Sequence, residues 1–251
     1  FSDASATPGF PGYKRGRVYV YDLDGTNRQD ISGPTPTQSA ELFGHTLAAT
    51  DTKIACGARN MDNGRGALFI MNYDGTAMTK IVPAVRDVDD YLSHVSINST
   101  KIAGGATGVG NDNQGAAYVF NHDGTGEVKI EASDSQGGNS FGQATALTQS
   151  KLIVGCPELG GVRAGSVYVY NLDGTGELKI TPSDGAPGDT FGYSVAVTPD
   201  NKIVVGSQSS DPGGLQDAGK VYTYNLDGSG ETIYQPDTPE AFAKFGSMVA
   251  G

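Results

Sequence analysis

The stretch from Gly165 to Ile180 reads Gly-Ser-Val-Tyr-Val-Tyr-Asn-Leu-Asp-Gly-Thr-Gly-Glu-Leu-Lys-Ile. Its run of Val and Tyr consists of β-branched and aromatic residues, which favour β-strands. The Asn-Leu-Asp-Gly segment that follows fits a type I turn, because Asn can bond the backbone of the turn and Gly can adopt the left-handed conformation after it. The stretch therefore predicts two antiparallel strands joined by a tight turn.

This hairpin is repeated along the chain of 251 residues, with further copies at 16–31, 66–81, 115–130 and 219–234. The Asp of each Asp-Gly pair lies at 24, 74, 123, 173 and 227, so successive copies are 50, 49, 50 and 54 residues apart. A period of this length indicates a repeat architecture in which each unit packs on its neighbours.

Two further motifs complete the repeat: a Phe-Gly pair or its equivalent begins one strand, and a Lys-Ile or Lys-Leu pair begins the next. Each unit then holds four short strands, and no segment shows a helical period. We therefore expect an all-β fold, a β-propeller of four-stranded antiparallel blades that forms a single domain over 1–251. A β-solenoid is the alternative, although its repeat is usually shorter. The expected units are 43–81, 91–130, 141–180, 191–234, and 245–251 together with 17–31, and residues 1–15 are expected to form a loop.

The composition limits the possible partners. The chain has 28 acidic and 17 basic residues, a net charge of −11, which argues against nucleic acid and anionic membranes as partners. It has no run of 18 apolar residues, so no membrane insertion is expected. Cys56 and Cys156 are expected to be small buried residues.

Three segments of the fourth unit resemble the FG-GAP repeat of integrin-α-like β-propellers: Phe-Gly-Tyr-Ser-Val-Ala at 191–196, Ile-Val-Val-Gly at 203–206 and Gly-Lys-Val-Tyr at 219–222. The resemblance implies that Phe-Gly opens the innermost strand and that Glu-x-Lys-Ile forms the outer edge. Many repeats of that family hold calcium between the first two strands. The corresponding connections here, such as Asp51-Thr52 and Ser99-Thr100, are too short and have too few carboxylates to enclose the ion. No cofactor is therefore expected.

The two ends of the chain fit the same repeat. Residues 245–251 supply only a first strand, whereas 17–31 supply strands three and four. Two interpretations remain open: the ends share the closing blade of a five-bladed ring, or the chain is a segment of a six- or seven-bladed propeller.

Catalytic motifs are not evident in the sequence, which has no Gly-x-Ser-x-Gly elbow, zinc-ligand spacing or phosphate loop. His45 and His94 occupy the same position in adjacent units, where the other units have Gln143, Tyr193 and Ser247. This pair could bind a metal, but we favour packing or a local hydrogen bond. The prediction is therefore no catalytic residue, no metal site and no enzymatic activity.

The variable loops are the expected ligand-binding surface, because protein scaffolds carry functional residues on loops. On the strand order implied by the resemblance, the loops between strands two and three share one face with the linkers between units. The candidate ligand-binding residues on this face are Asp62, Asp87, Asp89, Asp112, Glu158, Arg163, Asp189, Asp211 and Asp217, accompanied by Asp90, Asp134 and Asp184.

These features favour a non-enzymatic structural or binding module that is extracellular or on a virion surface, a setting that rests on analogy with similar repeats. The expected partner is a cell-surface glycan or protein, or another subunit of a larger assembly. The alternative function is a polysaccharide lyase or hydrolase with a carboxylate site in the central funnel, which requires paired carboxylates.

Overall fold

The structure is a computed structural model, and it describes residues 2–3, 16–34, 42–85, 90–110, 112–134 and 136–251. In this part of the chain the helical segments are a four-residue helix, α1 (Met61–Gly64), and a 3-10 turn at Pro212–Gly214. The expected all-β class is confirmed. Neither helical segment in the described residues is long and apolar enough to cross a membrane.

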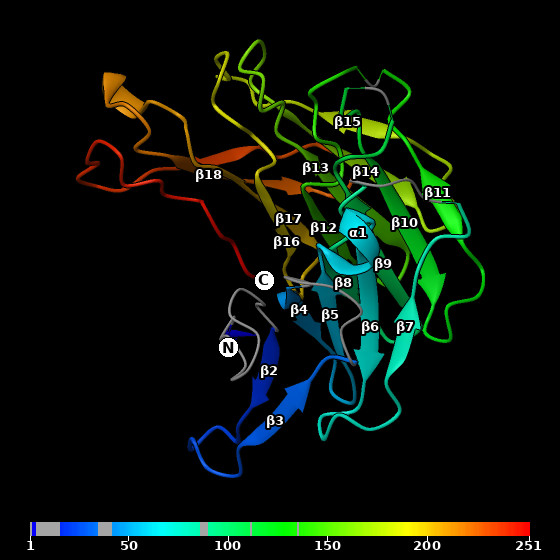
Figure 1. Cartoon of the computed structure of the whole chain (residues 1–251). Coiled ribbons are helices and arrows are strands. Elements are labelled where there is room, and N and C mark those ends of the chain that lie inside the picture. Colours follow the sequence, from blue (N-terminus) through cyan, green and yellow to red (C-terminus); the bar gives the residue numbers. More distant parts are fainter. Residues whose placement is uncertain (1, 4–15, 35–41, 86–89, 111, 135) are drawn as a thin grey trace.

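Four four-stranded antiparallel sheets follow one another along the chain, and we call them blades 1 to 4. Figure 1 shows the blades fanned around their first strands, β4, β8, β12 and β16, which gather in the middle of the molecule. The strands are β4 (Phe43–Ala49), β5 (Ile54–Ala58), β6 (Ala67–Met71) and β7 (Thr79–Ile81) in blade 1; β8 (His94–Ile97), β9 (Lys101–Ala106), β10 (Ala116–Asn121) and β11 (Val128–Ile130) in blade 2; β12 (Ala144–Leu147), β13 (Lys151–Cys156), β14 (Ser166–Asn171) and β15 (Leu178–Ile180) in blade 3; and β16 (Ser194–Val197), β17 (Lys202–Ser207), β18 (Lys220–Asn225) and β19 (Thr232–Tyr234) in blade 4.

The hairpin that the repeat predicts is present in every blade. In blade 3 the Gly174 amide donates to the Asn171 carbonyl at 3.0 Å, and Gly174 has a φ of 83°. The Asn171 side chain also joins the second strand, because its Oδ1 accepts a hydrogen bond from Lys151 Nζ at 2.7 Å. The same lysine–asparagine bond recurs in the other blades as Lys53–Asn72, Lys101–Asn121 and Lys202–Asn225.

The core is divided among the joints between blades. Tyr168 and Tyr170 of β14 pack with Phe141 and with apolar residues of blade 2, whereas Val167 and Val169 pack toward blade 4. Because β14 is covered on both faces, its apolar residues need not alternate with polar ones. Each such side chain contributes about 1.5–3 kcal/mol when it is fully buried.

The Phe-Gly motif was expected to open the innermost strand of each blade, but in blades 3 and 4 it lies before that strand. Only Phe43 lies inside its strand, β4; Phe141 and Phe191 precede β12 and β16 and bridge to Gly115 and Gly165 of the preceding blade. Gly142 has a φ of 91°, a left-handed conformation that turns the chain from this bridge into the next sheet. The motif therefore joins two blades.

A three-stranded sheet precedes blade 1 and contains β1 (Ser2–Asp3), β2 (Arg17–Val20) and β3 (Gln29–Ser32). The expectation of a loop over 1–15 is wrong at β1, which pairs with β2 through Ser2 and Val18; the positions after Asp3 up to 15 lie outside the described residues. Pairing with β2 places β1 where the blades have their second strand. This N-terminal sheet packs on blade 1 as the blades pack on one another, with Gly44 close to the Arg17 carbonyl and the Val18 side chain.

The C-terminal segment 245–251 stacks on blade 4. Phe245 bridges to Gly219, and Ser194 Oγ donates to the Gly246 carbonyl at 2.8 Å. Within the described residues no strand pairing joins this segment to the N-terminal sheet. The shared closing blade, made of 245–251 and 17–31, thus stays a prediction.

Candidate ligand-binding site

The loops between strands two and three contact the linkers between blades, as the implied strand order predicts. The amide of Phe141 donates to the Gln114 carbonyl at 3.1 Å, and that of Phe191 donates to the Ala164 carbonyl at 2.7 Å. The two loop sets therefore form one surface, which we call the loop face.

Four of the predicted residues make local contacts within the loop face. Asp62 forms an ion pair with Lys80 at 2.9 Å, and the Asp112 carbonyl accepts the Gly138 amide at 2.6 Å. Glu158 is 2% exposed, and its Oε2 lies 3.0 Å from Nε of Arg163, which also bonds Gln136. Because the Arg163 side chain is 41% exposed, the ion pair is only partly buried, and the bond from Arg163 to Gln136 joins the loop to its linker. Asp87 and Asp89 lie outside the described residues.

The structure brings the other three predicted residues, Asp189, Asp211 and Asp217, together in a hollow on the loop face of blade 4. The hollow has a volume of about 320 Å³. Its lining comprises Asp184, Ala186, Pro187, Gly188, Asp189, Ser209, Asp211, Gln216, Asp217 and Lys220. We refer to it as the acidic hollow.

Asp184 and Lys220 form the fixed wall of the acidic hollow. Lys220 Nζ donates to Asp184 Oδ2 at 2.7 Å, and the Tyr222 hydroxyl donates to Asp184 Oδ1 at 2.8 Å. Burial alone would raise the pKa of Asp184, but the bonds from Lys220 and Tyr222 together outweigh it and lower the pKa. Asp184 is therefore charged at neutral pH, and its charge is matched by Lys220.

Asp189 is the most enclosed carboxylate of the acidic hollow. Its carbonyl accepts hydrogen bonds from Ser207 Oγ at 2.9 Å and from the Ser209 amide at 3.3 Å. Burial raises the pKa of Asp189, although the Ala186 amide donates to its Oδ2 at 2.9 Å. The neighbouring Asp211 caps its own loop, because its Oδ1 accepts the Asp217 amide at 2.7 Å.

The acidic hollow is lined by four carboxylates and one lysine, so it presents mainly hydrogen-bond acceptors. Such a lining suits ligands that donate hydrogen bonds, such as sugar hydroxyls or ammonium groups, and disfavours anions. Sequence reasoning did not single out Lys220 and Gln216. One signal was available: the loop 207–218 is three residues longer than its counterpart 156–164, which accounts for most of the extra length of the last repeat.

The histidine pair lies on the first strands, within electrostatic range of Arg59 on the loop between β5 and β6. The rings of His45 and His94 are 6.2 Å apart between centroids and are nearly perpendicular. His94 Nδ1 is buried without a hydrogen-bond partner in the described structure. No group of three or more His, Cys, Asp or Glu side chains arranged to hold a metal occurs in the described residues.

Cys56 and Cys156 are free and buried, and burial raises the pKa of each thiol to about 12.

Repeated four-stranded antiparallel sheets, packed face to face around their first strands, define the blades of a β-propeller. The FG-GAP repeat family matches residues 125–170 and 175–224, so this part of the chain consists of FG-GAP repeats and the resemblance seen in the sequence is confirmed. No curated protein matches the chain. FG-GAP repeats are typical of extracellular domains, and they indicate a module of the binding or adhesion type.

Proposed function

We propose that this protein is a non-enzymatic extracellular binding module that recognises a cell-surface glycan through the acidic hollow of blade 4. The observation that carries the proposal is the convergence of Asp189, Asp211 and Asp217 in one hollow on the loop face. Carboxylate oxygens accept hydrogen bonds from sugar hydroxyls without a cofactor, and the proposal includes none. A cell-surface or virion appendage is the setting that we propose.

The test is glycan-array binding followed by titration of the best glycan against wild type and the double variant Asp211→Asn, Asp217→Asn. Asn keeps the shape of Asp and tolerates the left-handed conformation of Asp217, which has a φ of 52°. We expect at least a tenfold loss of affinity, because two charged acceptors are removed, and no loss on addition of EDTA. Asp112→Asn is the matched control, since Asp112 lies on the equivalent loop of blade 2 with a φ of 59°.

Array and pull-down experiments that find no glycan and no surface protein would contradict the binding function. A surface protein in place of a glycan, or assembly with another subunit, would change the partner but keep the site.

One observation supports the enzymatic alternative: the pKa of Asp189 is raised, and other carboxylates lie beside it. We expect neutral and acidic polysaccharides to yield no product when they are incubated with the protein. Product formation would establish the lyase or hydrolase alternative.

A further inference from the structure

A second hollow lies at the opposite end of the blades, between the turn that joins β2 to β3 and the turn that joins β6 to β7. We call it the hairpin groove. Its volume is about 470 Å³, which lies in the range of small-molecule sites. The lining residues are Val20, Tyr21, Asp22, Leu23, Asn27, Gln29, Tyr73 and Asp74.

The joint between the N-terminal sheet and blade 1 differs in sequence from the joints between blades 2 and 3 and between blades 3 and 4. Between blades 2 and 3, Val128 and Leu172 pack into the apolar core, and Leu178 and Leu226 do the same between blades 3 and 4. The strand registers place Gln29 where those joints have Val128 or Leu178, and the turn sequences place Tyr73 where they have Leu172 or Leu226. Polar and amphipathic residues thus replace the apolar pair of these two joints, as Thr79 and His122 also do between blades 1 and 2.

Asp22 is the second difference between the N-terminal sheet and the four blades. The four blades have Asn at this position, and its Oδ1 accepts a hydrogen bond from the lysine of the second strand. The corresponding strand of the N-terminal sheet is β1, whose described pairing with β2 reaches only Val18 and leaves no described partner opposite Asp22. The bond that the structure shows for the Asp22 carboxylate is from Asn27 Nδ2 at 2.6 Å. Within the described residues, Asp22 is therefore a carboxylate without a cation.

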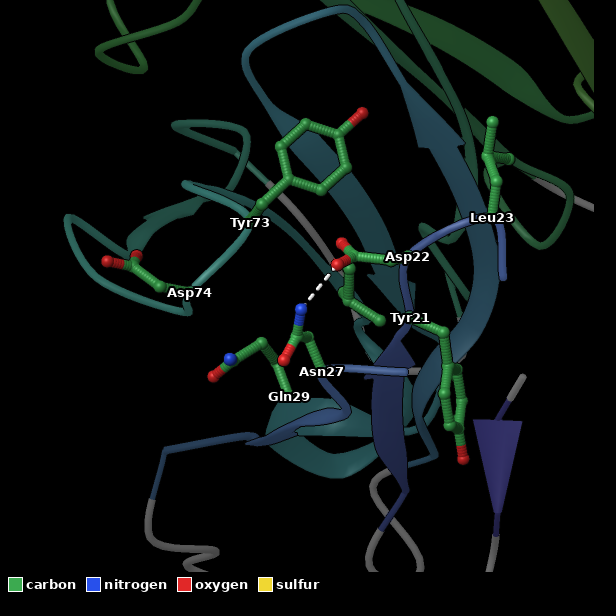
Figure 2. Close-up of a pocket in the computed structure, with 8 residues that line it drawn as sticks. Tyr21, Asp22, Leu23, Asn27, Gln29, Tyr73 and Asp74 are labelled. Atoms are coloured by element: carbon green, nitrogen blue, oxygen red, sulfur yellow. Dashed lines mark hydrogen bonds between the residues drawn. The ribbon is translucent and has the colours of Figure 1, made fainter. Parts of the chain in front are cut away.

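Tyr73 supplies an apolar ring to the same groove. Its hydroxyl donates to the Thr50 carbonyl of its own blade at 2.6 Å, and the residue is 38% exposed. Figure 2 shows Asp22, Asn27 and Gln29 on one side of the groove and Tyr73 with Asp74 on the other, while Tyr21 directs its ring away from Tyr73. A ligand in the groove would meet an aromatic ring together with one carboxylate and two side-chain amides.

The charge of the groove limits the ligand further. Asp22 and Asp74 line it, and none of the described lining residues is a lysine or an arginine. The nearby Arg28 is held by Asp30 at 3.0 Å and lies over the Tyr19 ring. An anionic ligand would therefore be repelled, whereas hydroxyl or ammonium groups would find acceptors.

We propose that the hairpin groove is a second, independent binding site for an uncharged or amine-bearing sugar residue. The sugar's hydroxyls would bond Asp22, Asn27 and Gln29, and its C–H face would lie on the Tyr73 ring. The two sites would lie at opposite ends of the blades, so one molecule could bind two glycan chains at once.

The test is saturation-transfer NMR and calorimetric titration with four probes: methyl galactoside, methyl mannoside, glucosamine and sialyllactose. We expect at least one of the first three to bind and sialyllactose to bind at least tenfold more weakly. The variants take residues from the other repeats, so each side chain already suits this fold. Asp22→Asn should weaken binding at least tenfold, and Gln29→Val with Tyr73→Leu should abolish it by removing the aromatic ring and one side-chain amide from the groove.

Glu131→Gln serves as the control, because Glu131 lines neither hollow and forms an exposed ion pair with Lys129, so it should leave binding of these probes unchanged. The pair Asp211→Asn, Asp217→Asn shows which of the two hollows holds the probe. Circular dichroism checks that each variant is folded, and Tyr73→Phe, which keeps the ring, should bind like wild type. The proposal is overturned if none of the first three probes binds at millimolar concentration, or if binding survives in folded Gln29→Val, Tyr73→Leu protein. Loss of binding in the acidic-hollow variant alone would assign the sugar to that site.

Discussion

At the residue scale, His94 is the side chain whose environment differs most from that of a histidine in water. Burial, with smaller contributions from His45 and Arg59, lowers the pKa of His94 from 6.5 to about 4. Burial and, to a lesser extent, Arg59 also lower the pKa of His45. The sequence predicted that the two histidines share a repeat position, but it could not predict that Nδ1 of one of them is sealed from water.

The lowered pKa of His94 predicts a pH-dependent stability. The folded state holds the neutral ring and the unfolded state binds a proton below pH 6.5, so the free energy of unfolding is highest above pH 6.5 and falls as the pH decreases toward 4. The loss amounts to about 3 kcal/mol, because each pKa unit corresponds to about 1.4 kcal/mol. Urea unfolding at several pH values measures it.

His94→Gln should remove most of this pH dependence between 6.5 and 4.5, because a glutamine side chain does not bind a proton in this range. The fold should accept the substitution, since Gln143 already occupies the equivalent position in blade 3. His122→Gln, which changes a histidine of a hairpin turn, is the control and should retain it. Parallel stability curves for wild type and His94→Gln would show that His94 is not the responsible group.

At the scale of the strand and its linker, a glutamate at the start of the outer strand fastens each later blade to the preceding linker. Glu177 accepts hydrogen bonds from the Ser133 amide at 3.1 Å, from Ser133 Oγ at 2.6 Å and from the Tyr170 hydroxyl at 3.0 Å. Glu231 bonds Ser183 and Tyr224 in the same way, and Glu127 accepts the Ala84 amide. Burial and the nearby Glu177 raise the pKa of Tyr170, so its hydroxyl remains a donor.

Replacing this glutamate should destabilise the protein measurably. Glu177→Gln keeps the size of the side chain but removes the charge that strengthens three hydrogen bonds, so we expect a loss of about 1–3 kcal/mol in the free energy of unfolding. Glu131→Gln is the matched control, because Glu131 forms an exposed ion pair with Lys129, and such pairs contribute about 0–1 kcal/mol. Equal losses in the two variants would contradict the role of Glu177.

The sequence predicted these elements unevenly. The Asn-x-Asp-Gly turns and the apolar runs before them locate the hairpins, because turn chemistry and β-propensity act locally. The bridge between Phe141 and Gly115, the strand at Ser2–Asp3 and the meeting of Asp189 with Asp217 depend on contacts between distant segments. A single copy of the repeat carries no information about those contacts, so they could not be read from the residues.

At the scale of the whole molecule, the N-terminal sheet and blade 4 each expose an aromatic residue at a position that the joints between blades bury. Tyr21 is 42% exposed and Tyr234 is 48% exposed, whereas their counterparts in blade 3, Tyr170 and Ile180, are buried between blades. Closure of a five-bladed ring would cover both, and burial of apolar surface stabilises by roughly 25 cal/mol per Å². We therefore expect segment 245–251 and the N-terminal sheet to share one blade, with the C-terminal strand next to β1.

The most direct test of this architecture is the distance between nitroxide labels at Asp30→Cys and Met248→Cys. Both positions are exposed, Asp30 lies on the outer strand β3, and the native Cys56 and Cys156 are buried, so labelling is selective. A shared blade places Met248 in the first strand and Asp30 in the fourth, and so predicts a narrow, short distance, about three strand spacings of 4.8 Å plus the reach of the labels. A broad distribution centred several blade widths away, with sheets about 10 Å apart, would contradict the five-bladed ring.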